Sequence, residues 1–205
     1  MNIEQIEIEL KKLPMMPAWG RKQFDDWDKL SSFVYALPSY EKLQEELKRL
    51  NKPTEFNNYV IHRWYNTLSA VGVEKIFSKL PNVLPNTNKY DKLVDFSINS
   101  ITFDHKTTVY PRNFGHDINF AKQNPQKLIS WLYAEQSKEG RFHTSNRLFI
   151  VLHKADTHHW KLRAELTRMK PIITDYVNKF DYKRLHRLNL ETGKTTLSDV
   201  IWLCD

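Results

Sequence analysis

The segment that decides the fold is residues 93–106, Leu93-Val-Asp95-Phe-Ser-Ile-Asn-Ser-Ile-Thr-Phe-Asp104-His-Lys106. Apolar and polar residues alternate on both sides of Asn99-Ser100, which predicts two antiparallel strands joined by a two-residue turn. In this register, Asp95 lies directly opposite Asp104 on one face of the hairpin, and Lys106 follows two residues further along that face. The other face is predicted to be a core face, made by the opposed pairs Ile98 and Ile101, Phe96 and Phe103, and Val94 and His105.

The two opposed carboxylates predict a metal site. Directly opposed residues have Cβ atoms about 4.5–5.5 Å apart, and like charges at that spacing destabilise a sheet. A cation between Asp95 and Asp104 would remove the repulsion, and Mg²⁺ prefers such oxygen ligands. Lys106 would lie beside the ion, where it can orient a water or stabilise charge on a phosphate. On this hypothesis, Asp104→Asn leaves the stability of the metal-free protein unchanged or slightly raised. The alternative is a solvated polar face of an edge hairpin.

Asp95, followed by Asp104-His-Lys106 on the next strand, resembles the PD-(D/E)XK nuclease superfamily, which has the restriction-endonuclease-like fold. The resemblance covers roughly residues 57–155, and Val94 replaces the proline that precedes the first acid in the family. It implies an α-β-β-β-α-β core, a divalent metal bound by the two acids, and a lysine that serves the attacking water. The D/E-x-K triplet also occurs at Glu9, Glu46 and Asp181, but only the triplet at Asp104 lies in a strand pattern.

The same resemblance implies further site residues. Many members of the superfamily add a glutamate from the helix before the hairpin, and Glu74 is the candidate because it lies near the inward stripe of that helix, with Glu55 as the fallback. An exposed helix residue is the alternative interpretation of Glu74. Candidate phosphate contacts, chosen by their proximity in sequence, are Arg112, Lys122, Lys127, Arg141, His143 and Arg147.

Hydrophobic periodicity outlines the rest of the chain. Helices are predicted over about 3–13, 21–36, 39–50 (with Ser39 as N-cap), 57–80, 125–137 and 156–180, the last capped by Asp156 and bent at Pro171. Strands are predicted over 93–98, 101–109, 147–152, 184–190 and 195–203, and a loop over 81–91. The fold class is therefore α/β: a restriction-endonuclease-like mixed sheet flanked by helices over 57–205, behind a helical N-terminal extension over 1–56.

Charge is distributed unevenly along the 205 residues, whose formal net charge is +7. Residues 106–190 contain 16 Lys and Arg against 7 Asp and Glu, whereas residues 1–105 contain 14 of each. A basic segment favours a polyanionic partner, nucleic acid above all, although an ordinary solvated basic surface is the alternative. The single cysteine excludes internal disulfides, and the five glycines include no phosphate-binding loop. No segment is long and apolar enough to span a membrane, and we expect a cytoplasmic protein.

Together these features predict a nuclease that uses Mg²⁺ or Mn²⁺ to hydrolyse phosphodiesters in nucleic acid, with DNA as the first choice. Asp95, Asp104 and Glu74 would hold the metal, and Lys106 would serve the water. Two alternatives stay open: a catalytically inactive nucleic-acid-binding module of the same fold, and a protein-interaction subunit that docks through its helical extension. The sequence leaves the oligomeric state, monomer or homodimer, undecided.

Overall fold

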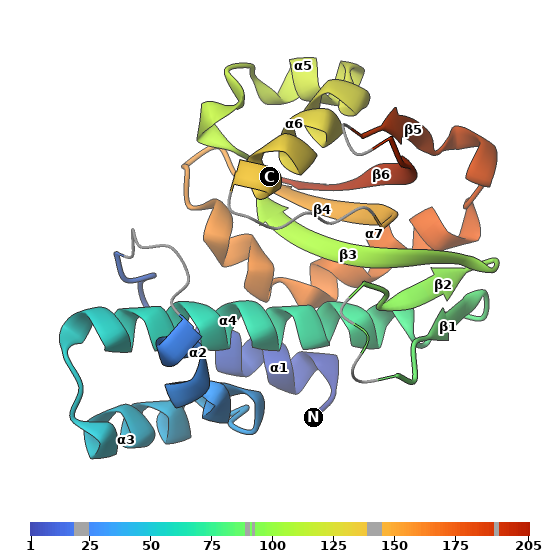
Figure 1. Cartoon of the computed structure of the whole chain (residues 1–205). Helices are drawn as coiled ribbons and strands as arrows, with labels where there is room; N and C mark the ends of the chain where they lie inside the picture. The colour runs from blue at the N-terminus through green and yellow to red at the C-terminus, as the bar shows by residue number, and fades with distance from the viewer. Residues whose placement is uncertain (19–24, 89–90, 92, 139–144, 191–192) are drawn as a thin grey trace.

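The computed structural model describes residues 1–18, 25–88, 91, 93–138, 145–190 and 193–205. Its first part is helical and its second part is built on a sheet (Figure 1). The N-terminal elements are α1 (Ile3–Lys11), α2 (Asp25–Leu30), the 3₁₀ helix η1 (Ser32–Tyr35), α3 (Tyr40–Leu50) and α4 (Thr54–Phe77). The predicted helices over 3–13, 39–50 and 57–80 are confirmed, and the Ser39 side chain accepts the Lys42 N–H as an N-cap.

A six-stranded mixed sheet forms the centre of the molecule, in the order β1-β2-β3-β4-β6-β5. Its strands are β1 (Val83–Pro85), β2 (Phe96–Ile98), β3 (Ile101–Val109), β4 (Arg147–His153), β5 (His186–Asn189) and β6 (Thr195–Cys204). β1, β2 and β3 form an antiparallel meander, β3, β4 and β6 are parallel, and β5 is antiparallel to β6. The predicted α/β class is confirmed at this level.

Helices cover both faces of the sheet (Figure 1). The connection from β3 to β4 passes through η2 (Arg112–Phe114), α5 (Ile118–Gln123) and α6 (Pro125–Lys138) on one face. The connection from β4 to β5 passes through η3 (His159–Ala164), α7 (Leu166–Asn178) and η4 (Tyr182–Arg184), and α7 lies on the opposite face with α4 and α1. Alternate residues of β4 therefore enter two cores, Leu148 and Ile150 on the α4 and α7 side and Phe149 and Val151 on the α6 side.

The predicted hairpin register is confirmed, because Phe96 pairs with Phe103 and Ile98 with Ile101. Asn99 and Ser100 both adopt positive φ angles, 46° and 69°, as the primed turn of a two-residue hairpin requires. β2 begins only at Phe96, whereas the sequence pattern predicts a strand from residue 93. Asp95 consequently lies at the point where β2 separates from the edge of β3.

Other predictions are corrected. The segment 156–180 is not one helix: η3 and α7 form there, and Asp156 lies before both of them. Its carboxylate accepts the His158 N–H and pairs with Lys154, so it stabilises a turn. The stretch 81–91, predicted as a loop, contains β1, and the short helix α5 was not predicted. The helix predicted over 21–36 is α2 and η1 in its described part.

The N-terminal helices share the main core with the sheet domain. Ile3, Ile6 and Leu10 of α1 are buried in the same cluster as residues of α4, α7 and the strands. α4 and α7 approach closely at Gly72, because a Cβ at this position would lie 2.5 Å from a Leu166 methyl group. The boundary between residues 56 and 57 stays a prediction, but α1 packs as an integral part of this core.

Among the described residues, no helix combines the length and the apolar character that a membrane span needs.

Candidate functional site

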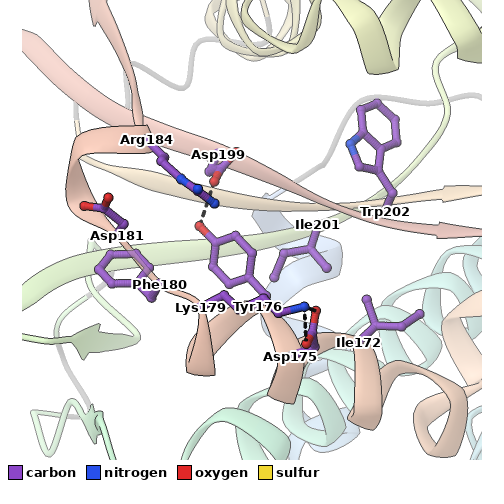
Figure 2. Close-up of a pocket in the computed structure, with 10 residues that line it drawn as sticks. All are labelled: Ile172, Asp175, Tyr176, Lys179, Phe180, Asp181, Arg184, Asp199, Ile201 and Trp202. Atoms are coloured by element: carbon purple, nitrogen blue, oxygen red, sulfur yellow. Dashed lines mark hydrogen bonds and ion pairs between the residues drawn. The ribbon is translucent and has the colours of Figure 1, made fainter.

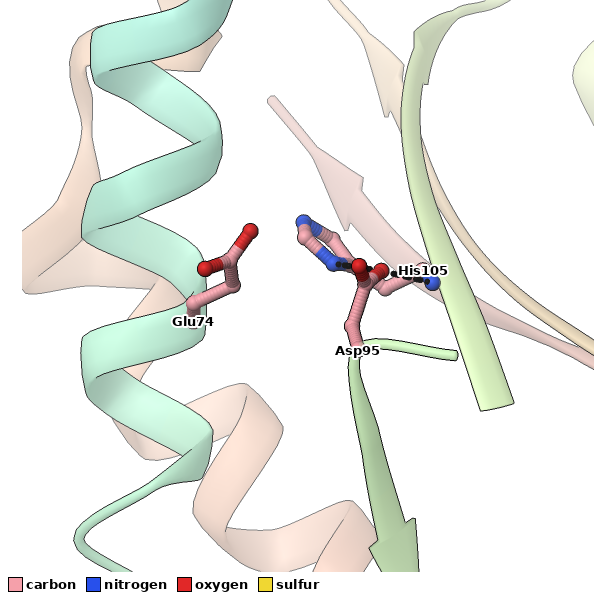
Figure 3. A group of neighbouring side chains, drawn as sticks. All are labelled: Glu74, Asp95 and His105. Carbon is pink, nitrogen blue, oxygen red and sulfur yellow. Dashed lines mark hydrogen bonds and ion pairs between the residues drawn. The ribbon is translucent and has the colours of Figure 1, made fainter. Parts of the chain in front are cut away.

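Three side chains from three elements converge beside the hairpin: Glu74 from α4, Asp95 at the start of β2 and His105 from β3 (Figure 3). One potential ligand atom of each lies within 4.8 Å of the others. No other such group of three occurs in the described part of the chain. The group is therefore the candidate metal centre, with two carboxylates and one imidazole as donors.

The local structure explains the convergence. His105 lies on the same face of β3 as Phe103, and α4 packs against that face. Asp95 precedes β2, its backbone N–H donates to the Phe103 carbonyl at 2.8 Å, and its side chain turns toward His105. Its Oδ2 accepts hydrogen bonds from the backbone N–H of His105 at 2.7 Å and from the ring Nδ1 at 2.8 Å. The ring also lies near Phe96 and Phe77, with centroid distances of 6.1 and 6.4 Å.

This contact assigns the imidazole tautomer. An ionised carboxylate only accepts hydrogen bonds, so Nδ1 of His105 carries a proton and donates it to Asp95. Nε2 then offers its lone pair, and a carboxylate behind a histidine is the usual partner that orients a metal-binding ring. Asp95 keeps its Oδ1 for a ligand, since no described residue bonds to this atom. Figure 3 shows the Glu74 carboxylate facing the ring from across the gap.

The two acids ionise differently. Burial opposes ionisation of Asp95, but the hydrogen bonds from His105 and the nearby charge of Lys106 outweigh it and lower the pKa of Asp95. The pKa of Glu74 is raised, first by the surrounding protein and then by the negative charge of Asp95, while His105 and Lys106 oppose the shift. The Glu74 side chain is nevertheless exposed to solvent, so the cluster is open on that side. A cation would favour the ionised form of both acids.

Asp104 is not part of this group, which changes the predicted metal ligands. Its side chain is on the opposite face of β3 from His105, and only 1% of the residue is exposed. Oδ2 accepts from Arg147 Nε at 3.0 Å and Oδ1 from Lys106 Nζ at 2.7 Å. The regular pairing of β2 with β3 ends at Phe96 and Phe103, so the predicted opposition of Asp95 and Asp104 is not part of it. The Asp95 side chain bonds to His105, and the two carboxylates do not form a shared metal site.

Lys106 lies between the buried Asp104 and the cluster of Glu74, Asp95 and His105. Its ammonium is bonded to Asp104 and its side chain is 42% exposed. Its positive charge contributes to the lowered pKa of Asp95 and opposes the rise in the pKa of Glu74, so it acts on the cluster without belonging to it.

The predicted nucleic-acid contacts fall into three groups. Arg112 on η2, Lys122 on α5 and Lys127 on α6 are exposed. Arg141 and His143 lie outside the described residues. Arg147 is corrected to a core residue, because it is 1% exposed and bound to Asp104. The fallback Glu55 lies in the first turn of α4, 19 residues before Glu74 and so about 28 Å away along the helix.

Sequence reasoning missed His105 as a site residue. The hairpin register placed it on the face of Phe103, and Glu74 was assigned to the inward stripe of the preceding helix. If that helix packs on that face, the two side chains must meet. The signal was therefore present, but it required combining the period of the strand with the face of the helix.

A separate recess of about 370 Å³ lies between α7 and β6, away from the cluster (Figure 2). Several of its polar groups bond to one another: the Tyr176 hydroxyl donates to Asp199 at 2.9 Å, and Lys179 pairs with Asp175 at 2.8 Å. It contains none of the three cluster residues, and its chemistry does not extend that site.

Comparison of the chain with protein-family models, with curated proteins and with solved structures gave no match.

Proposed function

We propose that this protein is a divalent-metal-dependent phosphodiesterase that hydrolyses nucleic acid, and that its substrate is DNA rather than RNA. The observation that carries the proposal is the convergence of Glu74, Asp95 and His105 next to the cation of Lys106. An imidazole beside two carboxylates fits Mn²⁺ at least as well as Mg²⁺, because imidazole suits transition metals whereas Mg²⁺ favours oxygen ligands.

A metal held by these residues would activate a water and stabilise negative charge on the phosphate. The residues of the chain have distinct tasks beside it. Asp95 orients the His105 ring through Nδ1, so that Nε2 is directed away from the carboxylate. Lys106 acts as a cation near the scissile phosphate. Its ammonium donates a hydrogen bond to Asp104, which fixes the position of the charge. Asp104 is therefore a positioning residue.

The order of elements supports the same proposal. α4, β1, β2 and β3 follow one another along the chain, and α6 and β4 come after η2 and α5, with an antiparallel meander and then a strand parallel to β3. Apart from η2 and α5, this order is compatible with the α-β-β-β-α-β core that the resemblance implies. Asp95 directly precedes β2 and the Asp104–Lys106 triplet lies in β3, which agrees with the acid and the triplet on the next strand that the resemblance implies.

A catalytically inactive nucleic-acid-binding module is the second candidate, and one observation favours it. The acid of the D/E-x-K triplet, Asp104, is committed to a buried ion pair with Arg147. A protein that had lost its chemistry could retain this pair for stability alone. The basic surface would then bind nucleic acid without cleaving it.

Metal binding and cleavage separate the two candidates. We expect wild-type protein to bind Mn²⁺ in calorimetry and to nick plasmid DNA when Mn²⁺ is present. Glu74→Gln removes one ligand charge and should weaken Mn²⁺ binding by about tenfold or more and abolish nicking. Glu55→Gln is the matched control, with the same change on the same helix about 28 Å away, and should match wild type.

Lys106→Met should bind Mn²⁺ like wild type but fail to nick DNA, because it removes the cation and keeps the ligands. DNA binding without nicking in any divalent metal would favour the inactive module. Equal Mn²⁺ binding by wild type and Glu74→Gln would reject the metal centre.

A further inference from the structure

The carboxyl ends of β3 and β4 meet away from the candidate metal centre. After β3 the chain continues to α5 and α6 on one face of the sheet, and after β4 it continues to η3 and α7 on the other (Figure 1). Neighbouring parallel strands whose connections leave in opposite directions create a crevice outside their carboxyl ends, where α/β proteins commonly bind ligands.

Two histidines lie at this position. His153 is the last residue of β4 and His159 the first of η3, and their ring centroids are 5.2 Å apart. His105 is level with Leu148 in the neighbouring strand, so His153 is five residues, about 16 Å, further along the sheet. The pair is therefore distinct from the candidate metal centre.

The hydrogen bonding of His159 leaves its Nε2–H as a hydrogen-bond donor. Its Nδ1 lies 2.7 Å from the backbone N–H of Lys154 and accepts a hydrogen bond from it. The neutral ring must then carry its proton on Nε2, which can donate to an oxygen but cannot offer a lone pair to a metal. No described residue hydrogen-bonds to the ring nitrogens of His153, and its ring lies edge-to-face with Tyr110 at 5.5 Å.

Two cations that have no ion-pair partner among the described residues lie near the histidines. Arg112 and Lys122 are exposed and form no ion pair with any described residue. Burial lowers the pKa of both rings, and positive charge lowers it further, from Lys122 at His153 and from His153 and Arg112 at His159, where Asp156 opposes the shift. Both rings are thus favoured in the neutral form, as single hydrogen-bond donors.

The acids around this position are already engaged. Asp156 pairs with Lys154, Asp205 pairs with Arg168 and Lys154, and Asp117 caps α5 through the Phe120 N–H. Within the described part of the chain, Arg112 and Lys122 therefore have no carboxylate that neutralises them. Such a concentration of unpaired donors and positive charge is what a phosphate group requires.

We propose that Arg112, Lys122, His153 and His159 form a binding site for a phosphate group, outside the carboxyl ends of β3 and β4. The two cations supply charge and the histidines supply directed N–H donors. The phosphate can belong to a polynucleotide backbone, or it can be a terminal or free phosphate. The site goes beyond the proposed hydrolysis, and it does not depend on the metal centre.

Calorimetry in EDTA tests the site without any contribution from metal. The probes are inorganic phosphate, a short single-stranded DNA with a 5′-phosphate, and the same DNA with a 5′-hydroxyl. We expect wild type to bind at least one probe and Arg112→Gln/Lys122→Gln to bind it about tenfold or more weakly, since charge-assisted hydrogen bonds are lost. Arg187→Gln/Lys194→Gln is the matched control, because it removes the same charge from two exposed residues on the β5–β6 hairpin and should leave affinity within about twofold.

A second pair of variants tests the histidines. His159→Phe keeps a ring but removes the donor, and should weaken binding by about three- to tenfold. His158→Phe changes the exposed neighbour and should have no effect. Equal binding of the 5′-hydroxyl and 5′-phosphate DNA assigns the site to backbone phosphates, whereas preference for the 5′-phosphate and inorganic phosphate assigns it to a terminal or free phosphate. Absence of binding to all three probes, or equal losses from test and control variants, would overturn the proposal.

Discussion

At the scale of single residues, the ion pair between Asp104 and Arg147 joins β3 to β4 inside the protein. Both side chains are almost fully buried, at 2% and 1% exposed. Arg147 Nη1 and Nη2 have no hydrogen-bond partner among the described residues, and its guanidinium lies 5.4 Å from the centre of the Tyr133 ring. Asp104 is therefore the only carboxylate that the described structure pairs with this buried charge.

Asp104→Asn should destabilise the protein. Removing one partner of a buried ion pair leaves the other charge uncompensated, at a cost of about 3–5 kcal/mol. Because the Asn amide can retain one hydrogen bond, we expect a loss in the free energy of unfolding at the lower end of this range, about 3 kcal/mol. Urea unfolding in EDTA measures this loss. Lys106→Met, at a half-exposed position, should cost about 1 kcal/mol or less. Unchanged stability of Asp104→Asn is the result expected from the sequence, and it would reinstate Asp104 as a repelled metal ligand.

At the scale of elements, α1 organises the starts of two other helices. Glu7 Oε2 accepts the Thr167 N–H in the first turn of α7 at 2.7 Å, and Glu9 Oε2 accepts the Tyr40 N–H at the start of α3 at 2.8 Å. α7 has no side-chain cap from its own N-cap residue, Glu165. A glutamate from another helix thus supplies both the hydrogen bond and the negative charge that this helix end favours.

Glu7→Ala should lower the free energy of unfolding by about 1–2 kcal/mol at pH 7, as the loss of a cap does. Burial opposes ionisation of Glu7, but the hydrogen bonds from Lys11 and Thr167 outweigh it and lower its pKa. A lowered pKa in the folded state gives stability that is complete above the unfolded pKa, about 4.3, and is lost as pH falls below it. The difference between wild type and Glu7→Ala should therefore shrink between pH 5 and pH 3, measured by chemical unfolding. Glu45→Ala, on the exposed face of α3, should show neither the loss nor this pH dependence.

At the scale of the whole molecule, three cations of the basic segment 106–190 lie on one connection of the sheet. Arg112, Lys122 and Lys127 are exposed on the connection between β3 and β4, and Lys127 lies 5.1 Å from the centre of the Phe120 ring. A cation above an aromatic ring beside other cations is a common feature of surfaces that bind nucleic acid. We expect this connection, rather than the helical N-terminal part, to contact the substrate.

Salt dependence measures this contact. Log K for duplex DNA should fall with log salt at a slope of about −3 to −5, with Ca²⁺ present to suppress cleavage. Arg112→Glu/Lys127→Glu should weaken binding to unrelated sequences alike. Lys48→Glu/Lys52→Glu is the control, with two exposed residues in the helical part and the same change in charge. Lys11 is unsuitable, because it pairs with Glu7 and Glu165. Equal losses from the two double variants would remove the case for a located binding surface.

The chain as a whole shows which features sequence can predict. The register of the hairpin depends on its own turn and alternation, and it is confirmed from Phe96 to Phe103 but not for the predicted pairs beyond them. The partner of Asp104 is Arg147, 43 residues later, and nothing local to the hairpin could reveal it. The helix predicted over 156–180 is interrupted at Glu165, whose φ of −85° and ψ of 54° are not helical, so that η3 ends before it and α7 begins after it. Local sequence patterns therefore predict most of the helices and strands. Which side chains meet depends on contacts between elements that are far apart in the sequence.

The position of β6 has a consequence for how the protein is made. β6 lies between β4 and β5 in the sheet, although its residues, 195–204, are synthesised after those of every other strand. A nascent chain that has not yet reached these residues leaves one edge of β4 unpaired, along the apolar run from Leu148 to Leu152. Unpaired apolar edges associate with other chains. The sheet therefore reaches its final pairing only after residues 195–204 have been synthesised, and until then the open edge of β4 favours association between nascent chains.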